Sequence, residues 1–343
     1  MSRLQTLGTA TKGPRIGENA IRPDGVPKVK GEFVFSNDLR HPDMIWGGTL
    51  RSPHPSARIV SINTIPALKM TGVHAVLTGE DLDDMPLYGL EHPDQPVLAD
   101  GVVRFQGEPV AIVAADHPEN VRRALEAIDV EYELIEPLSD SKLAQENEAI
   151  HPDGNLFREI NLSYGNSQEE GEITVEGTYE VGMQDQAPLG TESGMAIPSE
   201  DGGIDLFVST QWLHADRDQV AACLNLPPEK VRLTLAGVGG AFGAREDISL
   251  HIHLCLLAMR TGKPIKMSYS RTESFHGHVH RHPAQMWYRH HAKSDGTLTR
   301  IEARLLLDGG AYASTSSAVL ANATCFAAGP YRVPNVEIYG AVV

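Results

Sequence analysis

The segment of this sequence best suited to chemistry is a glycine-rich stretch at residues 237–246. It reads Gly-Val-Gly-Gly-Ala-Phe-Gly-Ala-Arg-Glu and lies between a predicted strand, Val231–Ala236, and a predicted helix, Asp247–Thr261. A loop in this position presents backbone N–H groups and the positive end of a helix dipole, which suits a phosphate or an anionic oxo group. The pattern therefore predicts an anion or cofactor cradle.

Two familiar anion-binding motifs do not fit the stretch. A dinucleotide-binding fingerprint needs glycine at the position of Phe242, and a phosphate-binding P-loop needs Gly-Lys-Ser/Thr where Gly243-Ala244-Arg245 stands. A glycine turn that only lets strand and helix pack closely explains the spacing equally well. From the residues alone, both interpretations stay open.

A run of alternating histidines is a second candidate for chemistry. Its members are His276, His278, His280 and His282. Residues two apart share one face of a strand, so these imidazoles could line up to bind a divalent metal. The simpler interpretation, which we favour, is a solvated strand or loop.

Alternation of apolar and polar residues predicts the elements that position these groups. Before residue 140 the predicted strands are Met44–Ser52, Arg58–Ile62, Val73–Leu77, Val102–Phe105, Val110–Ala114 and Val130–Glu133. One helix is predicted at His117–Ile128, with Asp116 as its N-cap. We predict an α+β domain over residues 21–140, preceded by a loosely held polar arm at residues 1–20.

Polar residues 141–171 predict a linker with one strand at Glu159–Ser163. Residues 172–343 form the second predicted domain, with a helix at His214–Leu224. Its predicted strands, besides the one before the glycine-rich stretch, are Ile173–Val181, Met195–Pro198, Ile204–Thr210, Ile265–Ser270, Ala284–Lys293 and Leu298–Leu307. The predicted fold class is α+β throughout.

Composition excludes several classes of function. The net charge of −16, from 29 basic and 45 acidic residues, disfavours nucleic acid and anionic membranes as partners. No apolar run approaches the roughly 20 residues that a membrane span needs, and the first residues lack the apolar core of a secretory signal. Cys223, Cys255 and Cys325 predict reduced, buried thiols in a cytoplasmic protein, and three cysteines cannot hold an iron–sulfur cluster that needs four.

The glycine-rich stretch resembles a motif of the molybdenum hydroxylases, the xanthine dehydrogenase/aldehyde oxidase family. The family motif is Gly-Gly-Gly-Phe-Gly-Gly-Lys-Glu, to which residues 239–246 are similar. Residues 183–192, 209–211, 308–312 and 329–335 also resemble family segments, and residues 24–31, 51–59, 107–111 and 130–133 resemble its small α/β hammerhead domain. Segments 182–192 and 210–246 are similar to bacterial xanthine dehydrogenase molybdenum-binding subunits, in their N-terminal half.

The resemblance implies a hammerhead domain at residues 21–140 and the first part of a molybdopterin-binding domain at residues 172–343. It implies oxidation of hypoxanthine or xanthine at an sp² carbon, with water as the oxygen source. The cofactor would be molybdenum–molybdopterin, as such or in its cytosine dinucleotide form. Iron–sulfur and FAD groups would lie on partner subunits, and the protein would supply orientation and electrostatics.

The resemblance also assigns site residues. Gln211 would donate a hydrogen bond to an oxo ligand of the molybdenum, and Glu246 would orient the substrate, so both are the predicted catalytic residues. Gly240, Ala241, Phe242 and Gly243 would cradle the pterin, with Phe242 also facing the substrate. No residue would bind the metal directly, because the pterin holds it. For Gln211 an ordinary polar strand-end residue, for Phe242 a core aromatic, and for Glu246 a carboxylate placed by a helix dipole are the structural alternatives.

Three residues depart from the family motif. Ala241 and Ala244 stand where the family has glycine, and Arg245 where it has lysine. An alanine at positive φ is strained, so a loop that needs positive φ at either position would have to differ locally.

The chain ends at Val343, before the segment that carries the general-base glutamate of the family. We therefore expect a separate C-terminal half of the molybdenum subunit as a partner. Two alternatives are another enzyme of the family, of the aldehyde oxidoreductase, carbon monoxide dehydrogenase or hydroxybenzoyl-CoA reductase type, and a non-catalytic fragment that binds metal through its histidines.

Overall fold

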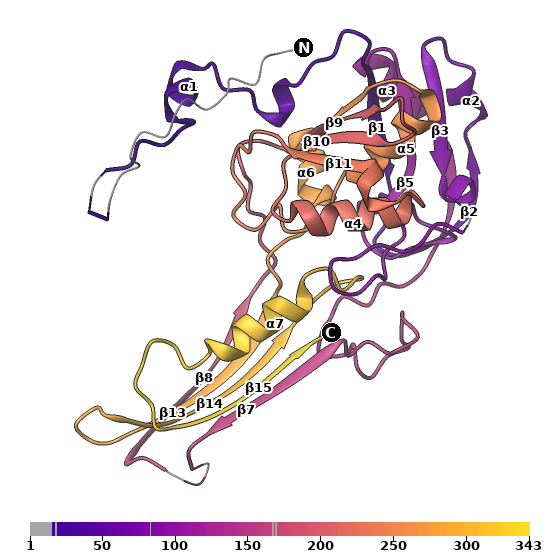
Figure 1. Cartoon of the computed structure of the whole chain (residues 1–343). Helices are drawn as coiled ribbons and strands as arrows, with labels where there is room; N and C mark the ends of the chain where they lie inside the picture. Colours follow the sequence, from indigo (N-terminus) through magenta and orange to yellow (C-terminus); the bar gives the residue numbers. More distant parts are fainter. Residues whose placement is uncertain (1–15, 18, 83, 167, 169) are drawn as a thin grey trace.

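The computed structural model describes residues 16, 17, 19–82, 84–166, 168 and 170–343. Most of the predicted arm, residues 1–20, lies outside the described residues. Figure 1 shows a main body of strands and helices, and an elongated sheet that extends from it. The predicted α+β class is confirmed, since mixed sheets with packed helices make up the fold.

A seven-stranded mixed sheet forms the centre of the main body. In spatial order its strands are β11 (Val231–Leu235), β10 (Ile204–Val208), β9 (Ser193–Pro198), β12 (Ile265–Ser268), β1 (Ile45–Arg51), β5 (Pro109–Ala115) and β3 (Val73–Thr78). β1 and β12 pair in parallel, with Ile45 opposite Ile265. Strands from both sides of the predicted linker therefore share one hydrogen-bonded sheet.

A three-stranded sheet lies at one side of the main body. It contains β4 (Val102–Val103), β2 (Ala57–Asn63) and β6 (Asp129–Leu134). Helix α3 (Pro118–Ala127) packs on β1 and β5 and buries Val121 and Ala124. The predicted N-cap, Asp116, is wrong by one residue. The N-cap is His117, which has an extended backbone and whose ring nitrogen accepts a hydrogen bond from the backbone N–H of Glu119.

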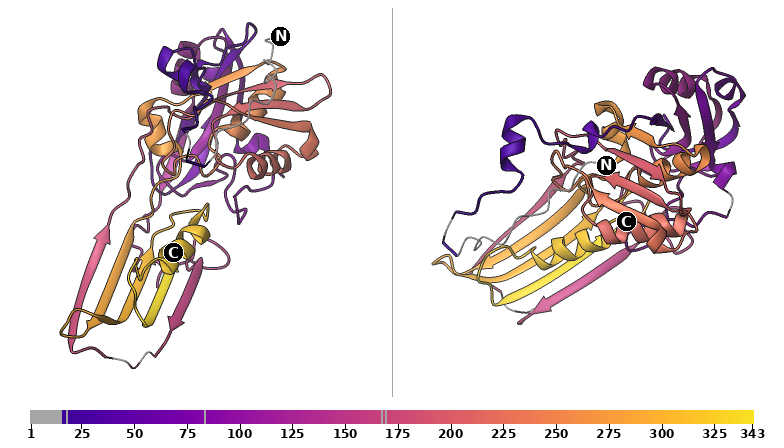
Figure 2. Two further views of the ribbon diagram at one scale, coloured as in Figure 1. Left: turned by 60° about the vertical axis from the view of Figure 1, so that its left-hand side comes forward. Right: turned by 45° about the horizontal axis from the view of Figure 1, so that its top comes forward.

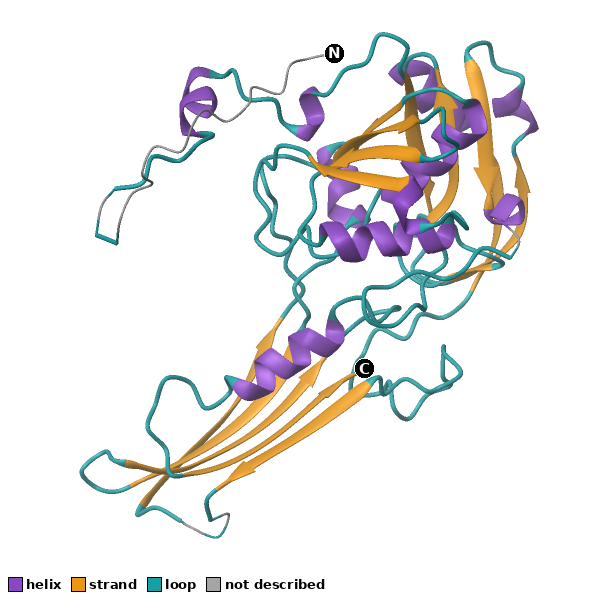
Figure 3. Cartoon of the chain, in the orientation of Figure 1, coloured by secondary structure: helices purple, strands orange, loops and turns teal. Residues whose placement is uncertain are grey.

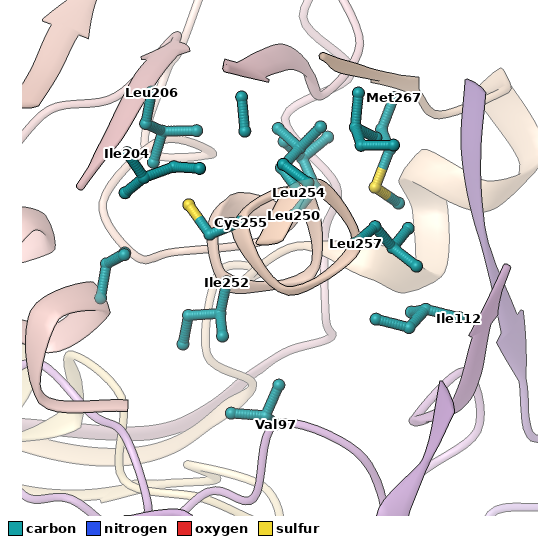
Figure 4. Close-up of a cluster of buried hydrophobic side chains, with 14 of the residues drawn as sticks. Val97, Ile112, Ile204, Leu206, Leu250, Ile252, Leu254, Cys255, Leu257 and Met267 are labelled. Carbon is teal, nitrogen blue, oxygen red and sulfur yellow. The ribbon is translucent and has the colours of Figure 1, made fainter. Parts of the chain in front are cut away.

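Helix α5 (His251–Thr261) is the buried centre of the main core. Figure 4 shows Ile252, Leu254 and Leu257 packed among strand residues such as Leu206 and Met267. The helix ends at Gly262, as predicted, in left-handed conformation. Its predicted start at Asp247 is wrong by four residues. Before the helix, the amides of residues 248 and 249 donate to the side chains of Asp247 and His251 in a non-helical turn, and α5 begins only after Leu250.

The elongated part is a five-stranded sheet. Its strands, in spatial order, are β7 (Arg158–Tyr164), β15 (Asn335–Val342), β14 (Leu298–Leu307), β13 (Ala284–Ala292) and β8 (Ile173–Val181). Helix α7 (Ser316–Cys325) lies along one face, as the views of Figures 2 and 3 show, and buries Leu320 against Ile338 and Val342. The strand predicted in the linker is real, and it forms an edge of this sheet.

The remaining helices are short, apart from α4. They are α1 (Gly25–Lys30), α2 (Ile65–Leu68), α4 (Leu213–Cys223), α6 (Arg271–Gly277) and the 3₁₀ turns Ser36–Asp38, Gly79–Leu82 and Pro228–Lys230. All three cysteines are free, but Cys325 is exposed at the end of α7, so the prediction of buried thiols is wrong for it. Within the described residues, no helix combines the length and the apolar character that crossing a bilayer requires.

Candidate functional site

The glycine-rich loop adopts left-handed backbone at two glycines and at Phe242, a residue type that rarely does so. It leaves β11 at Leu235, and φ is +111° at Gly240, +55° at Phe242 and +99° at Gly243. Ala241 and Ala244 are not among the described residues with positive φ. The two alanines that depart from the family motif therefore occupy positions that an L-residue adopts without strain.

Close backbone contacts fix the loop against a neighbouring segment. The amide of Gly190 donates to the carbonyl of Gly239, with 3.1 Å between N and O. A Cβ built on Gly239 would lie 3.1 Å from the Gly190 backbone, which is tighter than ordinary contact. On the other side, the Ser36 amide donates to the Gly237 carbonyl at 3.0 Å. Here glycine is required for close approach, which was one of the two interpretations of the spacing.

A buried ion pair secures the far end of the loop. The Arg245 guanidinium donates to the Glu192 carboxylate and, at 2.6 Å, to the carbonyl of Gly190. Both charged side chains are almost fully buried. The backbone carbonyl of Arg245 in turn accepts a hydrogen bond from the backbone N–H of Gln211, with 2.9 Å between O and N. The loop, residues 190–192 and the segment after β10 therefore form one hydrogen-bonded unit.

A pocket of about 380 Å³ lies beside this unit. Three predicted site residues line it: Phe242, Gly243 and Glu246. The other lining residues come from three segments, Gln184–Gln186, Val279–His282, and Thr315 with Val319. Phe242 is 78% exposed, so it is not a core aromatic, and Glu246 is half-buried. The helix-dipole explanation of Glu246 fails, because α5 begins only at His251.

The predicted residues are only partly brought together. Gly240 and Ala241 belong to the loop but do not line the pocket, and neither does Gln211. Gln211 is exposed and follows Thr210, whose hydroxyl donates to the buried Asp216 carboxylate. Burial raises the pKa of Asp216 to about 6. Asp216 thereby anchors the turn that presents Gln211 next to Arg245.

The loop fits a pterin cofactor that carries anionic groups. Among the described residues, the amides of Gly240, Ala241, Phe242 and Gly243 donate to no other group. The side-chain oxygen of Gln186 is buried without a partner at the pocket wall, and a Cβ on Gly243 would come within 3.3 Å of the Gln186 amide nitrogen. Free donors and a surface that glycine keeps open are what such a ligand needs.

The alternating histidines do not line one face of a strand: they lie in a helix end and a loop, which is part of the favoured interpretation, but the His278 side chain is buried and not solvated. His276 lies in helix α6, and His282 bonds to the Ser316 hydroxyl at 2.8 Å. The structure instead brings His278 and His280 to Asp185, which is 93 residues earlier in the chain than His278. The run of histidines could be recognised in the sequence, but no sequence pattern indicated that Asp185 would lie beside it.

Two family models and several known proteins match this chain. Residues 150–343 match the family model of the molybdopterin cofactor-binding domain, and residues 30–136 match that of the aldehyde oxidase and xanthine dehydrogenase a/b hammerhead domain. The chain is 38% identical over 325 residues to a probable xanthine dehydrogenase subunit of Bacillus subtilis, covering 93% of this chain and 44% of that protein. It is also 38% identical over 328 residues to the nicotinate dehydrogenase large molybdopterin subunit of Eubacterium barkeri, covering 94% of this chain and 77% of that protein.

Solved structures give the same picture. The aldehyde oxidoreductase from Desulfovibrio gigas superposes with a TM-score of 0.88 at 26% identity, over 94% of this chain and 38% of that one. Quinoline 2-oxidoreductase from Pseudomonas putida has a TM-score of 0.85 at 27% identity, over 97% and 45%. The chain thus spans less than half the length of most relatives it resembles here.

Proposed function

This chain belongs to the aldehyde oxidase and xanthine dehydrogenase family of molybdenum hydroxylases, and we propose that it is the N-terminal portion of a xanthine dehydrogenase-type catalytic subunit. The proposed reaction is oxidation of hypoxanthine or xanthine at an sp² carbon with water as the oxygen source. The observation that carries the proposal is the shared pocket of Phe242, Gly243 and Glu246 beside free loop amides.

Each residue has a proposed task. The loop amides of Gly240–Gly243 would bind the pterin, and the exposed amide side chain of Gln211 would donate a hydrogen bond to the cofactor. Glu246 would accept a hydrogen bond from a ring N–H of the substrate, against the exposed face of Phe242. The molybdenum cofactor, in plain or cytosine dinucleotide form, would supply the two-electron oxidation.

A second candidate substrate is a pyridine carboxylate. The Eubacterium relative, named a nicotinate dehydrogenase subunit, is as similar as the Bacillus one and is spanned over 77% of its length. Xanthine and nicotinate, for which the two relatives at 38% identity are named, are both nitrogen heteroaromatics, which supports a substrate of that class. An enzyme for aldehydes or carbon monoxide is less well supported, because the matched proteins of those types are 24–28% identical.

The proposal extends to organisation and partners. The family match at residues 30–136 supports the proposed hammerhead domain at residues 21–140. The match at residues 150–343 supports the proposed molybdopterin-binding portion at 172–343 and begins inside the proposed linker at 141–171. The longer relatives support a companion C-terminal half that brings the general base, with iron–sulfur and FAD subunits as electron acceptors. A cytoplasmic location is proposed on the three free thiols.

The test is to co-produce the chain with its companion subunits and to measure molybdenum, pterin and turnover of xanthine and nicotinate. We expect stoichiometric molybdenum and pterin, and faster turnover of xanthine. Gln211→Ala should retain the cofactor and lose turnover, whereas Gln145→Ala, in the exposed linker, should change neither. Zinc or nickel without molybdenum or pterin would contradict the proposal.

A further inference from the structure

Three side chains from two distant segments converge at the edge of the pocket. Asp185 Oδ2 lies 3.1 Å from His278 Nε2 and 3.0 Å from His280 Nε2. The two imidazole rings are stacked, with centroids 5.0 Å apart and planes 21° from parallel. One atom of each side chain falls in a group that spans at most 4.8 Å, so a single ion can reach all three.

The backbone holds these side chains in place. The Arg281 amide donates to the Gln184 carbonyl at 3.1 Å, which pairs the two segments. The other carboxylate oxygen, Asp185 Oδ1, accepts the Ala187 amide at 2.5 Å, so that Oδ2 is directed at the imidazoles. Outer hydrogen bonds of this kind orient metal ligands in proteins.

The hydrogen bond at Nδ1 of His278 leaves its other ring nitrogen, Nε2, facing Asp185. Its Nδ1 lies 2.7 Å from the Val279 carbonyl, which can only accept, so Nδ1 carries the hydrogen. In its neutral form the ring therefore directs the lone pair of Nε2 at Asp185 Oδ2, which also carries lone pairs. The Nε2 atom of His278 has no hydrogen-bond partner among the described residues, and the His278 side chain is 1% exposed. Two buried acceptors facing each other repel, and a cation between them reverses the sign of the interaction.

The spacing matches the coordination sphere of a small ion. Ligands about 2.0–2.2 Å from a zinc ion, at angles of about 90–110°, lie about 2.8–3.6 Å apart. Both distances from Asp185 Oδ2 to the histidine nitrogens fall in this range. Two imidazole nitrogens and one carboxylate oxygen suit Zn²⁺ and its first-row neighbours better than Mg²⁺ or Ca²⁺, which prefer oxygen ligands only. From this geometry we propose that Asp185, His278 and His280 bind a divalent first-row transition cation, with Zn²⁺ as the best fit.

The proposed ion has a defined place in the molecule. Asp185 and His280 line the same pocket as Phe242 and Glu246, and three protein ligands leave a coordination position open. That position would take water or an anionic group from the pocket, and the ion would tie residues 184–186 to residues 278–282. The proposal does not depend on the reaction proposed above.

The experiment is a Zn²⁺ titration of the full chain after treatment with a chelator, followed by calorimetry. We expect one equivalent to bind. His280→Ala and Asp185→Asn should weaken binding by about 100-fold or more, beyond the usual cost of losing an outer-sphere partner. The matched control is His276→Ala, an exposed member of the same histidine run, which should bind as the wild type does.

Co²⁺ gives a second readout that does not depend on heat. Its visible absorption should appear in the wild type and in His276→Ala, and should be lost in His278→Ala, with circular dichroism confirming that each variant is folded. If the three groups form only a hydrogen-bonded cluster around an imidazolium, the wild type will bind no stoichiometric ion, and the proposal is overturned. Equal binding by the His280→Ala variant would also overturn it. Neither result bears on molybdenum or pterin content.

Discussion

Replacing Arg245 tests how the glycine-rich loop is held. In Arg245→Met, a side chain of similar length loses the contacts to the Glu192 carboxylate and the Gly190 carbonyl. Both charged side chains are almost completely buried, at 5% and 1% exposure. Removing one partner of a buried pair leaves an uncompensated charge, which costs about 3–5 kcal/mol of unfolding free energy.

The assay is urea denaturation followed by circular dichroism, with the midpoint and slope compared between variants. The surface control is Arg58→Met, whose partner Glu133 lies 3.1 Å away with both side chains more than 60% exposed. Such exposed pairs contribute about 0–1 kcal/mol. Adding Glu192→Gln to Arg245→Met should recover part of the loss, because the stranded charge is then removed.

Arg245→Lys introduces the residue of the family motif. It keeps the charge but cannot donate to Glu192 and Gly190 from a planar fork, so we expect an intermediate loss of about 1–2 kcal/mol. If Arg245→Met costs no more than Arg58→Met, the buried pair does not secure the loop, and the reasoning is refuted.

Three further predictions concern the loop, the cofactor and pH. Gly243→Ala places a Cβ at φ +99° and should cost about 1–3 kcal/mol and lower the pterin content measured by fluorescence, whereas Ala241→Gly should cost at most about 1 kcal/mol. Gln211→Glu, which keeps the size but removes the amide donor, should retain molybdenum by metal analysis and lose turnover. Burial lowers the pKa of His251 to about 3 and that of His253 to about 4, whereas the unfolded value is near 6.5. As pH falls below 6.5, both imidazoles take up protons in the unfolded state and not in the folded state, so the free energy of unfolding decreases. Each histidine should lower it by about 2 kcal/mol between pH 6.5 and pH 5, measured by urea titrations at each pH.

Each of these has a contradicting outcome. Equal losses for Gly243→Ala and Ala241→Gly would show that positive φ is not what selects glycine there. Full turnover by Gln211→Glu would remove the donor role. For the pH effect, His253→Gln can keep the bond to the Val97 carbonyl without titrating, so an unchanged pH slope in that variant would exclude His253 as its source.

Much of the local structure follows from local sequence. The strands Ile173–Val181 and Leu298–Leu307 have the predicted bounds, since alternating apolar and polar residues mark them and turn residues mark their ends. The C-terminus of α5 is also predicted correctly, because glycine in left-handed conformation ends a helix whatever surrounds it. By contrast, helix α7 was not predicted: its Ser, Thr and Asn residues have weak helix propensity, and packing against β15 and β7 stabilises it.

The sequence by itself determined the fold class and the residues of the glycine-rich loop, because composition, periodicity and motif are properties of consecutive residues. Only the tertiary structure decided that β1 pairs with β12, that Arg245 is neutralised by Glu192, and that Asp185 meets His278 and His280. Each of these contacts joins residues more than 50 positions apart. Their closeness is set by how sheets and loops pack, which no pattern of neighbouring residues encodes.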